Sequence, residues 1–295
     1  MAVVTRPQLH VIFTLDCPPA GARVEPHGPV HWEASARAID AFCTTLLNAG
    51  FAPTLFLTPE AVEEHTPLCD DLLAAGADLG LFIQPQTVRG AQLRHYLGAY
   101  PAAQQRMIVA EALQRFEQAL ERRPLSVRSA MYSASDETFG VLSQLGFRQC
   151  SLSSPGRRVK KHGALWQHAP ADPHYTSATS RLEPGTLPLL EVPVTTDATQ
   201  NHGGLAPDLA IENGTVERWH RPLIAAQLER HEREQITFRV LCFVTSTRFP
   251  YYDRSSRYHQ TLDQLLDHLL ALDERYEVMP ATLGEVATRY HQHAP

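Results

Sequence analysis

The stretch LHVIFTLD at residues 9–16 decides the fold class of this chain. It is a short run of apolar and β-branched residues that ends on a carboxylate, which is typical of a buried β-strand. A helical pattern follows over Trp32–Asn48, where apolar residues recur at helical spacing, and Gly50 stands where the helix should stop. Comparable strand-like runs then alternate with helical patterns, at residues 54–58, 78–84, 126–131, 147–152, 187–194, 236–245 and 276–279.

Seven or eight strands separated by helices predict a parallel sheet with crossover helices. A (β/α) barrel, complete or incomplete, fits this order better than an open doubly wound sheet. No G-x-G-x-x-G or P-loop motif follows any strand, so the usual nucleotide-binding motifs are missing. In barrels the chemistry gathers at the C-terminal ends of the strands. That rule nominates Asp16, residues 82–86, Arg128 with Tyr132, Asp197 and residues 245–247.

The composition is that of a globular protein, with 295 residues, 43% hydrophobic and 20% charged residues, and a net charge of −6. We expect one domain over residues 1–295, with an irregular loop insertion at 154–186 that is rich in Pro, Gly, His and Ser. The mild acidity argues against nucleic acid as a partner. No apolar stretch approaches the roughly 20 residues of a membrane span, and residues 1–7 do not resemble a signal peptide. These features predict a cytoplasmic protein without a membrane segment.

The nominated positions resemble the polysaccharide deacetylase superfamily, which includes carbohydrate esterases and an allantoinase-like branch. The resemblance implies an irregular (β/α)7-type barrel over nearly the whole chain. The matching stretches, in chain order, are TLDC at residues 14–17, PTLFLT at 53–58, GLFIQPQ at 80–86, VRSAMYSASDET at 127–138, LGF at 145–147 and MPATLGEVA at 279–287.

The resemblance also implies a catalytic aspartate and a divalent metal held by a second aspartate and two histidines. Asp16 stands at the position of the first aspartate, the general base. Cys17 stands at the metal-binding aspartate, Phe82 at the first histidine, and Gln86 or Gln84 at the second. A phenyl ring cannot bind a metal and a neutral amide is a poor zinc ligand. We therefore expect a degenerate motif, no metal at this position and no cofactor.

Within this resemblance we assign Asp16 and Arg128 as the catalytic pair. Arg128 would position Asp16, and an ion pair between them would lower the pKa of the carboxyl and keep it ionised. The alternative for Asp16 is that it only caps the turn after its strand. We expect substrate contacts from a further set of polar residues near the strand ends: Cys17, Gln84, Gln86, Tyr132 and Thr245.

Three hypotheses about function remain open. The first is a carbon–nitrogen hydrolase that works without the usual metal, in which Asp16 activates water while Arg128 and nearby polar groups stabilise the oxyanion. The second is a noncatalytic descendant that binds a saccharide or a metabolite. The third is a different metal site rebuilt from His27, His31 or His202. In each case the expected ligand is a small molecule or a saccharide, and a homo-oligomer is left open.

Overall fold

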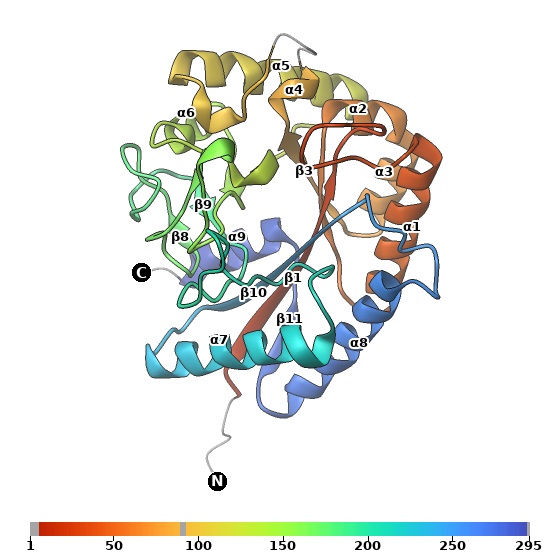
Figure 1. The fold of residues 1–295 in the computed structure, drawn as a ribbon, viewed down its shortest axis with the longest axis vertical. Helices are drawn as coiled ribbons and strands as arrows, with labels where there is room; N and C mark the ends of the chain where they lie inside the picture. Colours follow the sequence, from red (N-terminus) through yellow and green to blue (C-terminus); the bar gives the residue numbers. More distant parts are fainter. Residues whose placement is uncertain (1–5, 89–92, 294–295) are drawn as a thin grey trace.

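The computed structural model describes residues 6–88 and 93–293. In this part of the chain, nine strands form one curled sheet, in the order β10-β1-β2-β3-β4-β5-β9-β8, with β11 also paired to β1 (Figure 1). All neighbouring pairs are parallel except β8 with β9. The predicted mixed α/β fold of a barrel type is confirmed, in the form of a half-barrel.

The first half of the chain contains β1 (Gln8–Cys17), α1 (Trp32–Asn48), β2 (Thr54–Leu57), α2 (Pro59–Glu64), α3 (Thr66–Ala74), β3 (Asp78–Ile83), α4 (Pro85–Val88), η2 (Leu97–Ala99), α5 (Ala102–Leu120), β4 (Ser126–Ser129), η3 (Ala130–Tyr132) and α6 (Thr138–Gln144). The second half contains β5 (Gln149–Cys150), β6 (Arg158–Val159), η4 (Lys160–His162), β7 (Ala164–Leu165), β8 (His174–Tyr175), β9 (Leu190–Glu191), η5 (Val216–His220), α7 (Arg221–Arg233), β10 (Arg239–Ser246), α8 (Arg257–Ala271), η6 (Leu272–Glu274), β11 (Glu277–Pro280) and α9 (Leu283–His293).

The two faces of β1 pack against different parts of the molecule. Successive side chains of a strand point to opposite faces of the sheet. Leu9, Leu15 and the alternate residues between them join a hydrophobic cluster with the helices, including Phe42 of α1. Ile12 lies on the other face, in an inner cluster with Phe56 and Phe82. The position of a residue in β1 therefore decides whether it faces the helices or the inside of the barrel.

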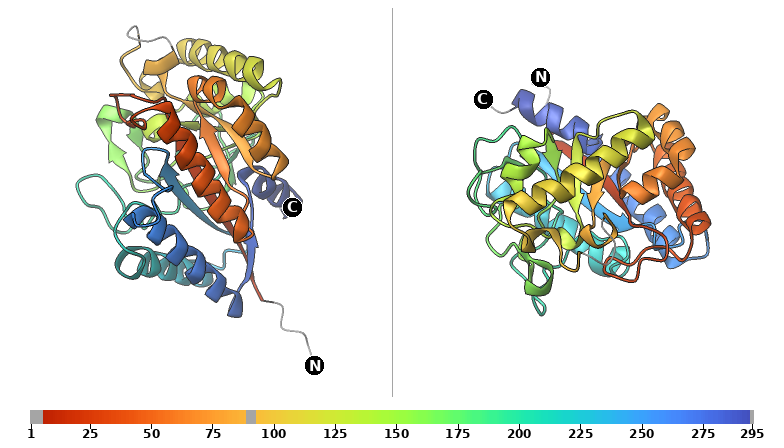
Figure 2. Two further views of the ribbon diagram at one scale, coloured as in Figure 1. Left: turned by 90° about the vertical axis from the view of Figure 1, so that its right-hand side faces the viewer. Right: turned by 90° about the horizontal axis from the view of Figure 1, so that it is seen from above.

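Helices cover the outer face of the sheet. Helix α1 has the predicted bounds, and the His31 Nδ1 atom caps it by accepting a hydrogen bond from the Ala34 N–H at 3.1 Å. Figure 2 shows α1 in red beside α8 in blue on this face. No helix of the described residues is long and apolar enough to cross a bilayer.

An irregular segment between β9 and β10 in the sequence is bonded to the edge of β10. The Thr195 N–H donates to the Cys242 carbonyl at 3.2 Å, and the Ile211 N–H donates to the Val244 carbonyl at 3.0 Å. These bonds place residues 208–212 beside the C-terminal end of β10. The region predicted as an irregular insertion contains the short antiparallel pair of β6 and β7 and the strand β8. Trp166 of this region is fully buried, so the region packs onto the barrel.

Candidate functional site

The candidate site lies at the C-terminal ends of β1 and β4. The Asp16 Oδ1 atom accepts a hydrogen bond from the Arg128 Nη1 group at 2.9 Å, and the two side chains form an ion pair. The Asp16 side chain keeps 15% of its exposed surface, whereas the Arg128 side chain has none. Only the carboxylate of this pair can therefore contact a substrate.

Several partners orient Arg128. Its Nη1 also donates to the Thr14 hydroxyl at 2.8 Å, and its Nε and Nη2 donate to the carbonyl and the hydroxyl of Ser151 at 3.0 and 2.8 Å. Its guanidinium carbon lies 4.4 Å from the ring centroid of Phe56. Because its N–H groups are already used and buried, Arg128 is a positioning residue, and the expected direct contact with an oxyanion does not fit this placement.

The pKa of Asp16 departs from the expected direction. Burial raises it above the ordinary value, and the charge and hydrogen bond of Arg128 offset only part of that rise. Removing a carboxylate from water favours its neutral form, and here this outweighs the attraction of the cation. The expected lowering of the pKa is thus wrong for this site.

Sequence reasoning missed two carboxyl groups, Asp208 and Glu212. Glu212 Oε2 accepts a hydrogen bond from the Thr245 hydroxyl at 3.0 Å. Asp208 Oδ1 accepts from the Asn213 Nδ2 group at 2.7 Å and from the Ala210 N–H at 3.2 Å. Burial raises the pKa of Asp208, and it raises that of Glu212 to about 7, with further contributions from the charges of Asp208 and Asp16. The site therefore combines three interacting carboxyl groups.

Tyr132 lies near the same groups, as its place after β4 predicts. Burial raises the pKa of its hydroxyl, which the charges of Arg128 and Asp16 also affect, so the group stays a neutral donor. The Arg157 guanidinium carbon lies 5.1 Å from the centroid of its ring. Met131 and Tyr132 have φ of +58° and +60°, in the left-handed region that side chains disfavour. Tyr132 is thus held in a strained backbone conformation beside the carboxyl groups.

Gln84 and Gln86 follow β3. Gln84 is fully buried, and its Nε2 donates to the Pro26 carbonyl at 3.4 Å. The side-chain oxygens of both glutamines are buried and have no hydrogen-bond partner among the described residues. An unpaired buried oxygen is costly, so these two amides lack the full set of partners that a buried polar group needs.

The loop after β1 covers this side of the barrel. Its residue Glu25 accepts hydrogen bonds from His162 Nε2 at 2.8 Å and Lys161 Nζ at 3.0 Å. The Tyr96 hydroxyl donates to the Glu25 carbonyl at 2.8 Å. Together with the bond from Gln84 to Pro26, these contacts hold the loop over the end of β3.

The remaining predicted residues lie apart from the carboxyl groups or are buried. Cys17 is fully buried on the helix side of β1, near Cys43 and Cys69, and its pKa lies well above the ordinary value because of burial. The structure thus contradicts a role in substrate binding, since Cys17 shares a face with Leu15. Thr245 is 1% exposed and its hydroxyl lies between Glu212 and the Tyr251 hydroxyl, 2.6 Å away. It orients Glu212 and cannot contact a substrate.

Asp197 forms a hydrogen bond within its own loop, in which its Oδ2 accepts from Gln200 Nε2 at 2.6 Å. Of the histidines named for a rebuilt metal site, His31 caps α1 and His202 lies in a turn with Leu205.

The residues present do not fit the divalent metal that the resemblance implies. The thiol of Cys17 points into the core, Phe82 belongs to the inner apolar cluster, and Gln84 offers only an amide. Over residues 6–88 and 93–293, no three His, Cys, Asp or Glu side chains are grouped as metal ligands.

Comparison with known proteins gives a match in structure only. No family model and no curated protein matches the sequence. A candidate polysaccharide deacetylase from Mycobacterium smegmatis superposes with a TM-score of 0.65 at 14% identity, over 99% of this chain and 93% of the other. The Puue allantoinase gives 0.63 at 13% identity, over 97% and 91%. A candidate glycoside hydrolase/deacetylase from Parabacteroides distasonis gives 0.69 at 13% identity, over 99% and 73%.

These likenesses span almost the whole chain, and they agree with the order of motifs and with the half-barrel sheet. At 13–14% identity they establish architecture and not activity. The chain therefore has the fold of the polysaccharide deacetylase superfamily.

Proposed function

We propose that this protein hydrolyses a non-peptide carbon–nitrogen bond of the amide type without a divalent metal. The observation that carries the proposal is the Asp16–Arg128 pair at a strand end, with only the carboxylate exposed and Glu212 close enough to affect it electrostatically. A carboxylate whose pKa is raised is a better proton acceptor than an ordinary one.

In the proposed reaction, Asp16 accepts a proton from water, and the water oxygen forms a bond to the amide carbonyl carbon. The carbonyl oxygen becomes an oxyanion, for which the Tyr132 hydroxyl is the nearby neutral donor. Glu212 in its protonated form donates a proton to the leaving nitrogen as the carbon–nitrogen bond breaks. The products are a carboxylic acid and an amine, and the proton on Asp16 returns to Glu212 through solvent.

The separation of roles between Asp16 and Glu212 follows from their surroundings. Arg128 favours the ionised form of Asp16, while Glu212 has no cation among its hydrogen-bond partners in the described chain and a pKa of about 7. Two carboxyl groups with different environments divide the tasks of base and acid. Arg128 contributes by fixing the direction of the Asp16 carboxylate.

The names of the similar structures suggest the substrates to test. Two of them are described as deacetylases and one as an allantoinase. We therefore infer an N-acetylated saccharide or a cyclic amide as the substrate class. Gln86 is half-buried, and its unpaired side-chain oxygen can accept a hydrogen bond from a hydroxyl or amide group of such a ligand.

The test is hydrolysis of N-acetylglucosamine oligomers and of allantoin by the wild type, Asp16→Asn and Asp40→Asn. Asp40 is an exposed residue of α1, so its variant controls for the chemical change. We expect Asp16→Asn to lower kcat/KM at least about a hundredfold and Asp40→Asn to leave it unchanged. Activity that a chelator removes and a divalent metal restores would contradict the metal-free reaction.

The noncatalytic alternative makes a different prediction for the same proteins. A saccharide-binding descendant would show no turnover of either substrate between pH 5 and 9. It would bind the oligomers in calorimetry, and Gln86→Leu would weaken that binding. Hydrolysis that depends on Asp16 therefore separates the two functions.

A further inference from the structure

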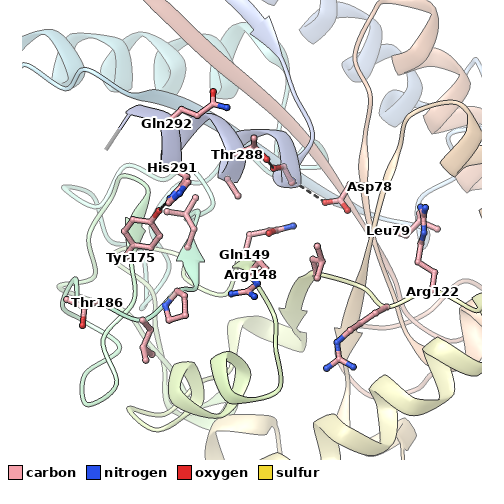
Figure 3. A pocket seen from close by; sticks show the side chains of 18 of the residues that line it. Asp78, Leu79, Arg122, Arg148, Gln149, Tyr175, Thr186, Thr288, His291 and Gln292 are labelled. Carbon is pink, nitrogen blue, oxygen red and sulfur yellow. Dashed lines mark hydrogen bonds between the residues drawn. The ribbon is translucent and has the colours of Figure 1, made fainter. Parts of the chain in front are cut away.

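A cavity lies at the opposite end of the sheet from Asp16. It has a volume of about 1100 Å³ and opens where β3 and β5 begin, beside helix α9 (Figure 3). Asp78 and Gln149 line it from these strands, and Thr288 and His291 line it from the helix. Its size is that of a small-molecule site.

Apolar side chains form much of its wall. Leu187, Pro188 and Leu190 line it from the segment before and within β9, and Leu125 lines it from the segment before β4. Leu125 is 46% exposed, although most large apolar side chains of this protein are buried. An exposed leucine at the edge of a cavity leaves apolar surface that a ligand can cover.

Three arginines also line this cavity, and within the described residues only Arg123 has a side-chain partner. Arg123 pairs with Glu117 and also donates to the Leu145 carbonyl. The side chains of Arg122 and Arg148 are exposed and have no hydrogen bond or ion pair within the described part of the chain. Figure 3 shows both side chains at the same cavity. Arg122 and Arg148 thus place two side-chain cations in the lining of this cavity, whereas the whole chain carries a net charge of −6.

The acid in the wall has hydrogen-bond partners other than these arginines. Asp78 Oδ2 accepts hydrogen bonds from the Ser126 hydroxyl at 2.6 Å and the Gly284 N–H at 3.2 Å. Burial raises its pKa, which favours the neutral form. The Tyr175 hydroxyl lies 3.0 Å from His291 Nδ1 and closes the other side of the cavity.

We propose that this cavity binds a small amphipathic anion, with an apolar chain or ring against the leucines and a carboxylate or phosphate on Arg122 and Arg148. Arginine presents a planar fork that matches both anionic groups. The site is independent of the proposed hydrolysis, since it shares no residue with the Asp16 site and lies at the other end of the strands.

Calorimetric titration of the full chain with decanoate and with decyl phosphate tests this proposal and distinguishes the two anionic groups. We expect saturable binding of at least one of them with one site per chain. Arg122→Gln/Arg148→Gln should weaken it at least tenfold. Arg218→Gln, which changes an exposed arginine of η5, should bind as the wild type does. Unchanged affinity in the double variant, or equal binding of decyltrimethylammonium, would overturn the proposal.

A second comparison tests the apolar part of the site. Leu125→Gln should weaken the binding of the decyl ligand, and inorganic phosphate alone should bind at least tenfold more weakly than decyl phosphate. Asp16→Asn should leave decanoate affinity unchanged, which separates this site from the catalytic one. Inorganic phosphate binding as tightly as decyl phosphate would show that the apolar wall plays no part, and the proposal would be wrong.

Discussion

The arginines at the two ends of the sheet differ in burial and in the partners of their side chains. At the C-terminal end, Arg128 is fully buried, pairs with Asp16 and donates to Thr14 and Ser151. At the N-terminal end, Arg122 and Arg148 are exposed beside an apolar cavity, and their side chains have no partner in the described chain. A buried charge depends on its partner, whereas an exposed one is already solvated. Mutation of the arginine at the C-terminal end should therefore lower the stability of the protein. Mutation of the arginines at the N-terminal end should change only ligand binding.

Replacing Arg128 should cause the largest loss of stability among the variants that compare the two ends. Arg128→Met leaves the Asp16 carboxylate buried without its cation and removes the bonds to Thr14 and Ser151. We expect a loss of about 3–5 kcal/mol in the free energy of unfolding, measured in urea. Arg128→Met/Asp16→Asn should recover part of this loss. A single variant as stable as the wild type would show that the pair is not structurally coupled.

A matched pair of aspartates compares the two ends directly. Asp16→Asn leaves Arg128 uncompensated, so we expect a loss of about 3 kcal/mol. Asp78 at the other end has no arginine partner among the described residues, and an amide oxygen can still accept from Ser126 and Gly284, so we expect Asp78→Asn to cost about 1 kcal/mol. Both are measured by urea unfolding at pH 7. Equal losses would mean that burial, and not the ion pair, dominates at Asp16.

The pH dependence of stability should report on Glu212. Its pKa is about 7 in the folded protein, above its ordinary value of 4.5, so the folded state keeps a proton that the unfolded state releases. The contribution of protonated Glu212 to the free energy of unfolding is fully present below pH 4.5 and is lost as the pH rises through 7. We expect Glu212→Gln to remove roughly 2 kcal/mol of this decline between pH 5 and 8, allowing for partial exposure.

The measurement is the difference between the wild-type and Glu212→Gln unfolding free energies at each pH, because histidines titrate in both proteins. A difference that does not change between pH 5 and 8 would place the pKa of Glu212 in its ordinary range.

The smallest change in stability should come from a mutation at the N-terminal end of the sheet. Arg148→Gln changes an exposed side chain that has no partner in the described chain, so the free energy of unfolding should stay within about 0.5 kcal/mol of the wild type. Thermal and urea unfolding check this. A loss of 2 kcal/mol or more would reveal a structural role for Arg148 and would weaken its assignment to a ligand.

Local sequence patterns predicted most of the fold. The apolar runs at residues 9–16 and 54–58 correspond to β1 and β2, and the helical pattern at Trp32–Asn48 has the bounds of α1. Both features depend on periodicity within one element. The same periodicity explains why the predicted role of Cys17 in substrate binding was wrong. Residue 17 shares the parity of Leu9 and Leu15, so its side chain had to face the helices.

What the sequence by itself determined was the order of strands and helices, and hence that Asp16 and Arg128 lie toward the C-terminal ends of two strands of one barrel. The tertiary structure alone decided that Asp208 and Glu212 join them. These two residues lie in an irregular segment that is held by backbone bonds to distant residues, among them Val244 of β10 and Thr195. It also decided that burial raises the pKa of Asp16 despite Arg128. Periodicity encodes which face of an element is apolar, but desolvation and long-range hydrogen bonds arise only when distant segments pack together.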